Sequence, residues 1–217
     1  MFKRYLYSLA GFLCLLVIYW LTLLPILSVR TSLDTGQYGL ALLIWAVLAA
    51  AFLLPALAII LKKAWFFRGQ GEPVVLDLLQ DLLLAVNEHD APVSVQKRGR
   101  KMAASWRYQE PKWSERMEKK GMTRLFELWL RFDNNTKTVT MTDRYRSVNW
   151  DLSPIVVKTG WLALASPLCR VRIGPDWGIE NYEDTIPEDY TFSEQEIKSP
   201  FLNTILRNGW NVRFSLF

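Results

Sequence analysis

Two uncharged apolar stretches near the N-terminus constrain this chain more than any other feature. Residues 5–27 read YLYSLAGFLCLLVIYWLTLLPIL and residues 39–61 read GLALLIWAVLAAAFLLPALAIIL. Each stretch supplies the roughly 20 apolar residues that a helix needs to cross the hydrocarbon core of a bilayer. The sequence therefore predicts that residues 1–70 form a transmembrane hairpin with helices at about 5–27 and 39–61, followed by a short interfacial linker from Trp65.

Basic residues flank this expected hairpin unequally. The loop between the two stretches contains one basic residue, Arg30. The outer flanks contain Lys3, Arg4, Lys62, Lys63 and Arg68. Because Lys and Arg collect on the cytoplasmic side of membrane proteins, we expect both termini to be cytoplasmic, with a bacterial inner membrane as the location. The alternative for the first stretch is a cleaved signal peptide, but such signals have a shorter apolar run and a small-residue cleavage motif that is missing here.

The overall charge and the cysteine usage fit a membrane protein of a reducing compartment. The net charge is +5, which basic flanks and attraction to anionic lipid can account for without nucleic acid. Cys14 lies in the first apolar stretch and Cys169 lies in the remainder of the chain, so a disulfide between them is not expected. Low cysteine usage is typical of proteins in reducing compartments.

Residues 71–217 read as one soluble domain that begins with an amphipathic helix at about 73–87. The apolar side of this helix comprises Leu76, Leu79, Leu83 and Val86. Its polar side is acidic, which disfavours an anionic lipid surface. We therefore expect the apolar side to pack on a sheet, with a partner helix as the remaining alternative.

Alternation of apolar and polar residues predicts the strands of that sheet. We expect strands at residues 92–96, 102–108, 125–132, 137–142, 160–165 and 170–173. In LFELWLRF, the third of these, Glu127, Trp129 and Arg131 alternate with apolar residues, and KTVTMT repeats the alternation after an Asp-Asn turn. This pattern is typical of a β-hairpin with one polar face.

The most complete set of local signals lies after residue 192. Ser193 and Glu196 have the spacing of a capping box at a helix N-terminus, and Gly209 can close the helix. Pro200, after a serine, offers a second possible start. The apolar stripe comprises Ile197, Phe201, Ile205 and Leu206. Residues 210–217 alternate again, so the sequence predicts an α+β fold with helices packed on a mainly antiparallel sheet.

Catalytic and cofactor-binding motifs are not found in this sequence. His89 is the only histidine, so no Ser–His or Cys–His pair can be built on another base, and the two cysteines make no zinc set. Glycine-rich phosphate loops are also missing. The acidic segment 176–196 is expected to be a solvated loop, with a Mg²⁺ or Ca²⁺ site of a metal-dependent hydrolase as the alternative. No cofactor is therefore expected.

The most unusual stretch of the soluble part is residues 97–124, which hold ten basic residues and three acidic ones. These candidate binding residues are Lys97, Arg98, Arg100, Lys101, Arg107, Lys112, Arg116, Lys119, Lys120 and Arg124. Trp106, Trp113 and Trp129 are the candidate aromatic contacts. Interleaved basic and aromatic residues are typical of surfaces that bind nucleic acid or lipid headgroups, although a plain solvated face has the same composition.

The sequence favours a non-enzymatic inner-membrane protein. We expect its cytoplasmic domain to dock or regulate partners in a membrane-associated assembly. The expected partners are membrane lipids and either another protein or a second copy of the chain. The alternative is a membrane-anchored sensor or effector that binds nucleic acid or anionic lipid through residues 97–124.

Overall fold

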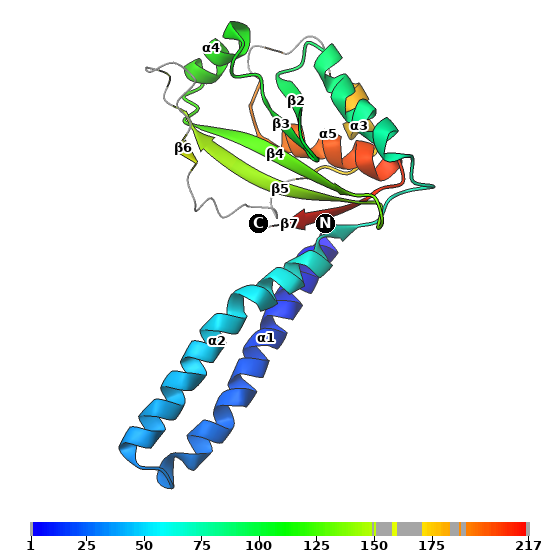
Figure 1. Cartoon of the computed structure of the whole chain (residues 1–217). Helices are drawn as coiled ribbons and strands as arrows, with labels where there is room; N and C mark the ends of the chain where they lie inside the picture. The colour runs from blue at the N-terminus through cyan, green and yellow to red at the C-terminus, as the bar shows by residue number, and fades with distance from the viewer. Residues whose placement is uncertain are drawn as a thin grey trace. The chain divides into compact units, whose positions relative to one another are not determined.

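The computed structural model of the chain separates into two compact units, Met1–Trp65 and Phe66–Phe217. It describes residues 2–148, 150, 158–159, 171–182, 187 and 190–215. The first unit is a pair of long helices and the second is an α+β fold (Figure 1). The boundary after Trp65 lies a few residues before the one that the sequence predicts at residue 70.

Two long apolar helices make up the N-terminal unit, as the sequence predicts. Helix α1 spans Phe2–Ser28, a short 3-10 turn η1 spans Val29–Thr31, and helix α2 spans Thr35–Ala64. The candidate membrane spans within them are 28 and 30 residues long, with mean hydropathies of 2.4 and 2.7. Only 6% and 0% of their apolar windows are buried inside the structure, so both helices are long and apolar enough to cross a membrane.

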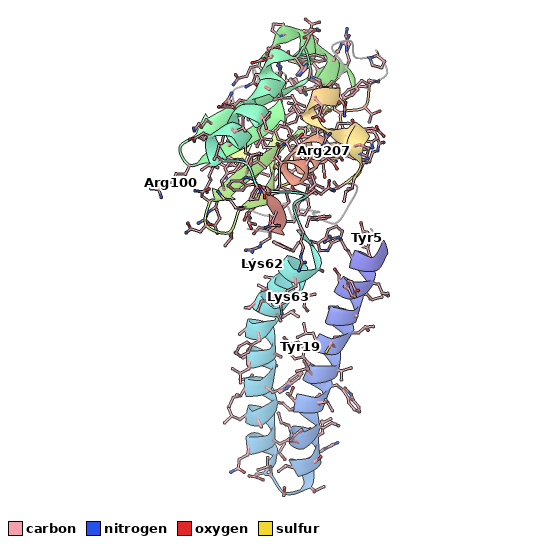
Figure 2. The ribbon with its side chains drawn as sticks, turned by 90° about the vertical axis from the view of Figure 1, so that its right-hand side faces the viewer. Tyr5, Tyr19, Lys62, Lys63, Arg100 and Arg207 are labelled. Carbon is pink, nitrogen blue, oxygen red and sulfur yellow. The ribbon has the colours of Figure 1, made fainter. Side chains whose placement is uncertain are left out.

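Hydrogen bonds and close packing join the two helices to each other. The Tyr19 hydroxyl on α1 donates to the carbonyl oxygen of Ala49 on α2 at 2.9 Å (Figure 2). The Trp45 indole N–H donates to the Thr22 hydroxyl at 3.1 Å. A Cβ atom added at Gly11 would lie 2.8 Å from Ile60 Cγ2, so a small residue is needed there for the helices to approach.

The C-terminal unit is built on a mixed seven-stranded sheet in the order β1-β7-β5-β4-β3-β2, with β6 paired to β5. The strands are β1 (Phe66–Phe67), β2 (Val93–Arg98), β3 (Lys101–Trp106), β4 (Arg124–Asp133), β5 (Thr138–Ser147), β6 (Lys158–Thr159) and β7 (Asn211–Ser215). All pairs are antiparallel except β5 with β7, which are parallel. The sheet is thus mixed, because β7, which follows helix α5, runs parallel to β5.

Most of the predicted strands are present in this sheet, and two short strands are additional. The β2–β3 and β4–β5 hairpins lie where the alternation predicts them. Strand β1 occupies part of the segment that reads as a linker, and β6 was not expected. The expected strand at 160–165 lies outside the described residues. The described part of the other, 171–173, is not a strand.

Helices α3 (Leu76–Leu84) and α5 (Glu194–Arg207) lie on the same side of the sheet (Figure 1). Helix α3 continues as the 3-10 turn η2 (Ala85–Glu88), and it begins after Pro73 instead of at it. Helix α5 runs through Pro200 and does not restart there. Its Ser193 cap position is as predicted, but the serine side chain makes no capping hydrogen bond. The predicted apolar stripe of α5 is buried, as are Leu79, Leu83 and Val86 before it.

The remaining described helical segments are short. Helix α4 spans Pro111–Lys119 and connects the end of β3 to the start of β4. The 3-10 turns η4 (Pro175–Trp177) and η5 (Ile179–Asn181) precede α5. The polar segment 109–123 thus contains a short helix.

A tight backbone joint connects the start of the sheet unit to the turn between α5 and β7. The Gln70 amide donates to the Leu206 carbonyl oxygen at 2.7 Å, and the Trp210 indole N–H donates to the Val74 carbonyl oxygen at 2.8 Å. Gly209 has φ +78°, and a Cβ atom there would lie 2.3 Å from the Glu72 carbonyl oxygen. Only glycine meets both the conformational and the spatial demand at this position.

Candidate binding face of the sheet

The two faces of the sheet differ sharply in chemistry because successive side chains of a strand point to opposite faces. On β4, Phe126, Leu128 and Leu130 are buried on the side of α5, as the sequence predicts. The opposite face carries six cations. They are Arg98, Lys101, Arg131, Arg144, Arg146 and Arg213, and we call this the basic face.

Four of these cations fall in one line across the strands, which we call the cationic row: Arg98, Lys101, Arg131 and Arg213. Lys101 pairs with Arg98 on one side and with Arg131 on the other. Arg131 then pairs with Thr140, and Thr140 with Arg213. Arg213 pairs finally with Phe66 of β1, so the row reaches from the β2 edge of the sheet to β7, the strand next to the β1 edge.

Like charges directly opposite each other on neighbouring strands destabilise a sheet, by roughly 0.2–1 kcal/mol per pair. Arg98, Lys101 and Arg131 are exposed, and among the described residues none of them has a carboxylate within ion-pair distance. The sheet therefore carries three neighbouring positive charges that folding alone does not require.

Trp129 lies beside the cationic row with cations around its ring. The guanidinium carbon of Arg144 lies 4.4 Å from the ring centroid, that of Arg98 lies 5.6 Å away, and the Lys101 ammonium lies 5.9 Å away. Cations over an indole ring are attracted by its quadrupole. The half-buried Trp129 thus holds three long basic side chains close together on one surface.

Two carboxylates lie on the basic face, and they leave the cationic row largely uncompensated. Glu127 is 2% exposed, accepts a 3.1 Å hydrogen bond from the Trp129 indole and pairs with Arg146 at 2.7 Å. Asp133 is exposed at the outer end of β4. A hydrogen bond from the Thr136 hydroxyl is the main cause that lowers the pKa of Asp133, and attraction to Arg213 contributes.

The structure divides the basic stretch 97–124 among four surroundings. Arg98 and Lys101 join Trp129 on the basic face, and Arg100 occupies the β2–β3 turn (Figure 2). Lys97, on the same strand as Arg98, points to the other face. The remaining candidates belong to α4 or its flanks: Arg107, Lys112, Arg116, Lys119, Lys120 and Arg124.

Several of those remaining residues make local contacts. Arg107 donates to the carbonyl oxygens of Val93 at 3.0 Å and His89 at 2.8 Å, which fastens the end of α3 to β2. Lys112 pairs with Asp90, and its ammonium also lies 4.8 Å from the Trp113 ring centroid. Trp106 and Trp113 are each 1% exposed and belong to the core. An aromatic contact on the basic face therefore falls to Trp129 alone of the three candidates.

Sequence reasoning missed Arg144, Arg146 and Arg213 as members of this surface. They come from β5 and β7, which are far from residues 97–124 along the chain. A signal was present, because the alternation of LFELWLRF places Arg131 on the face of Trp129, and the alternation at 210–217 places Arg213 opposite the buried residues. The strand order that aligns them cannot be read from alternation.

A second polar cluster lies on the opposite side of the sheet, beneath α5. Lys198 is 0% exposed and pairs with Asp143, whose side chain is 1% exposed. Its ammonium also lies 3.6 Å from Glu194, which accepts a hydrogen bond from the Tyr145 hydroxyl. Both Lys198 and Asp143 fall at positions of their elements where the periodicity calls for apolar residues. Two opposite charges at such positions are a signal in the sequence that could have revealed the pair.

This buried cluster connects α5 to the sheet and offers no surface to a ligand. Burial raises the pKa of Asp143, and the charge of Lys198 offsets part of that effect. Burial and the hydrogen bond to Glu194 both raise the pKa of Tyr145. The cluster contains an acid, a base and a phenol, but because the Lys198–Asp143 pair is enclosed we assign it to the support of α5.

Three of the four described acids of the segment 176–196 are engaged in ion pairs, and the fourth, Asp176, is exposed. Glu180 pairs with Arg207 (Figure 2), Glu194 with Lys198, and Glu196 with Arg172 at 3.8 Å. Burial raises the pKa of Glu196, and Arg172 opposes that shift. Within the described part of the chain, no three His, Cys, Asp or Glu side chains come close enough to hold a metal ion.

Comparison of the chain with protein-family models, with curated proteins and with solved structures found no match. Any function assigned to it therefore depends on the geometry of the molecule itself.

Proposed function

We propose that this protein is a membrane-anchored, non-enzymatic binding module. Helices α1 and α2 cross a bilayer, both chain termini lie on its cytoplasmic side, and the C-terminal unit binds an anionic partner through the basic face. The cationic row carries this proposal, because it places like charges opposite one another without local neutralisation.

The exposure of the two apolar helices supports the anchoring part of the proposal. Their most apolar windows are 6% and 0% buried, whereas the core helix of a soluble protein buries its apolar stripe. Side chains such as Trp20 and Leu54 are 64% and 67% exposed. An apolar surface of this extent is stable in lipid and aggregates in water.

The basic face supports the binding part of the proposal. A face with six cations and two carboxylates attracts polyanions, and exposed charges make such binding dependent on salt. The enclosed Lys198 cluster, by contrast, provides no comparable surface. One surface, the basic face, thus fits both the docking role that the sequence favours and its alternative, the binding of an anionic ligand.

The test uses the full chain in mild detergent and heparin as a polyanion probe. The variant Lys101→Gln/Arg131→Gln removes two charges from the row, and the control Lys119→Gln/Lys120→Gln removes two exposed charges at the end of α4. We expect the row variant to elute from immobilised heparin at clearly lower salt than the control. Equal elution would show that only net charge matters and would refute the basic face as the binding site.

A further inference from the structure

The cationic row has the dimensions of a contact with an extended surface. The row crosses five strands from β2 to β7, and at a spacing of ~4.8 Å its cations extend over about 19 Å. Its charges project from one sheet face at intervals along this line. A line of separated cations matches an array of anionic groups better than it matches a single small anion.

The end of the row next to β1 is tied to the anchor by the chain itself. Helix α2 ends at Ala64 and β1 begins at Phe66, so two residue steps separate them, a span of at most ~7 Å. Phe66 lies beside Arg213, whose guanidinium carbon is 5.8 Å from the Phe66 ring centroid. If α2 ends at the membrane surface, as proposed above, this edge of the sheet is held close to the lipid headgroups.

Other basic residues lie near the two ends of the row along the chain. Lys62 and Lys63 lie in the last turn of α2 and are exposed (Figure 2). Arg100 is exposed in the turn between β2 and β3, next to Arg98 and Lys101 of the row. Basic side chains beside a membrane segment are attracted to anionic lipid, each by about 1 kcal/mol near the surface.

Two other occupants of the basic face have less support. A second copy of the chain could offer exposed acids such as Asp77, Asp81 and Glu88, but it would have to be recruited from elsewhere, whereas the chain itself ties the row to the proposed anchor. Single-stranded nucleic acid stacks its bases on open aromatic rings. Trp129 is half-buried, and Arg144 lies 4.4 Å from its ring centroid.

We infer that the cationic row binds the anionic phospholipid headgroups of the bilayer that holds α1 and α2. This inference rests on the proposed function and names the ligand of the same face. Binding would lay the sheet against the headgroups, with the β2–β3 and β4–β5 turns at the contact. Zwitterionic headgroups would not support it, because the interaction is one of net charge.

The experiment compares the full chain in two kinds of nanodisc, phosphatidylcholine alone and a phosphatidylcholine–phosphatidylglycerol mixture. Amide hydrogen exchange is followed in the turns at residues 99–100 and 134–137. We expect slower exchange in the anionic discs only, with loss of this protection at high salt. The row variant Lys101→Gln/Arg131→Gln should lose the protection, and the control Lys119→Gln/Lys120→Gln should keep it.

The outcomes separate this inference from the function on which it rests. A chain that fails to enter either nanodisc overturns the anchoring proposal. A chain that enters both but shows equal exchange in the turns overturns the lipid inference and leaves the anchor intact. Protection of the turns by a single-stranded RNA oligonucleotide in phosphatidylcholine discs, without an effect of phosphatidylglycerol, overturns it in favour of nucleic acid.

Discussion

Lys198 and Asp143 form an ion pair that is buried in the core between α5 and the sheet. Lys198 lies on the buried side of α5, between Ile197 and Phe201 in the chain, and its ammonium is 5.0 Å from the Phe126 ring centroid. Withdrawing either charge from water is unfavourable, and the partner offsets that cost only while both are present. The pair thus makes the position of α5 depend on Asp143 of β5.

Removal of one partner of this pair should destabilise the fold more than removal of both. We expect Lys198→Met and Asp143→Leu each to lower the free energy of unfolding by about 3–5 kcal/mol, because the first leaves the buried Asp143 carboxylate without its cation and the second leaves the buried ammonium with only the more distant Glu194, 3.6 Å away, as an ion-pair partner. The double variant Lys198→Met/Asp143→Leu should recover most of this loss. Urea unfolding of the full chain in mild detergent, followed by tryptophan fluorescence, measures the effect, and additive losses in the double variant would contradict it.

Replacing Lys101, the central lysine of the cationic row, should stabilise the fold instead of destabilising it. Lys101 lies between Arg98 and Arg131, so Lys101→Gln removes two like-charge contacts. With two contacts removed, we expect the free energy of unfolding to rise by about 0.4–2 kcal/mol. The control Lys119→Gln should leave it within about 0.5 kcal/mol. Destabilisation by Lys101→Gln in the same urea assay would mean that the row serves the fold.

At the scale of the elements, the joint between the segment after β1 and the α5–β7 turn depends on Gly209. Gly99 in the β2–β3 turn has a similar backbone, with φ +62°, but nothing lies within 4 Å of its added Cβ. Both glycines therefore have a positive φ, but only Gly209 lacks room for a side chain. They form a matched pair for measuring how closely the two segments are packed.

We expect Gly99→Ala to lower the free energy of unfolding by about 1–2 kcal/mol through backbone strain alone. Gly209→Ala should lower it by about 2–5 kcal/mol, because its Cβ also meets the Glu72 backbone. Thermal unfolding of the two variants in the same detergent compares them. Equal losses would show that the joint is loosely packed.

Elements that are long enough to show a repeating pattern of apolar residues could be predicted from the sequence. Elements that form only by pairing with another strand could not. Alternation over many residues located β4 and β5, and the apolar stripe located α5. Strands β1 and β6 are two residues long, too short to show a period, and they exist through pairing with β7 and β5. The basic face was found only in part for the same reason, because Arg98 and Lys101 are near in sequence whereas Arg213 joins them through strand order.

At the scale of the whole molecule, the unequal distribution of basic residues sets the expected orientation in the membrane. One cysteine is placed at Ser32 in the loop between α1 and α2, or at Gln109 in the C-terminal unit, with both native cysteines replaced by serine. Both positions are exposed. Their labelling by a membrane-impermeant maleimide reports which side of the bilayer each occupies.

We expect the Ser32→Cys variant to be labelled in intact spheroplasts and the Gln109→Cys variant only after permeabilisation, because the positive-inside rule keeps the basic flanks in the cytoplasm. Labelling at Gln109 in intact spheroplasts would reverse the orientation. Recovery of the full chain in the soluble fraction without detergent would contradict the proposal that α1 and α2 cross a membrane.

The pairing of β1 with β7 also sets an order of events during synthesis. Phe66 is added to the chain about 150 residues before its partner Arg213, an interval on the order of 7 to 30 seconds at the usual rates of translation. If α1 and α2 form the proposed anchor, they can insert into the membrane over that time while the edge of the sheet that joins them to the second unit is still open. The anchor is therefore in place before the unit that it holds can close.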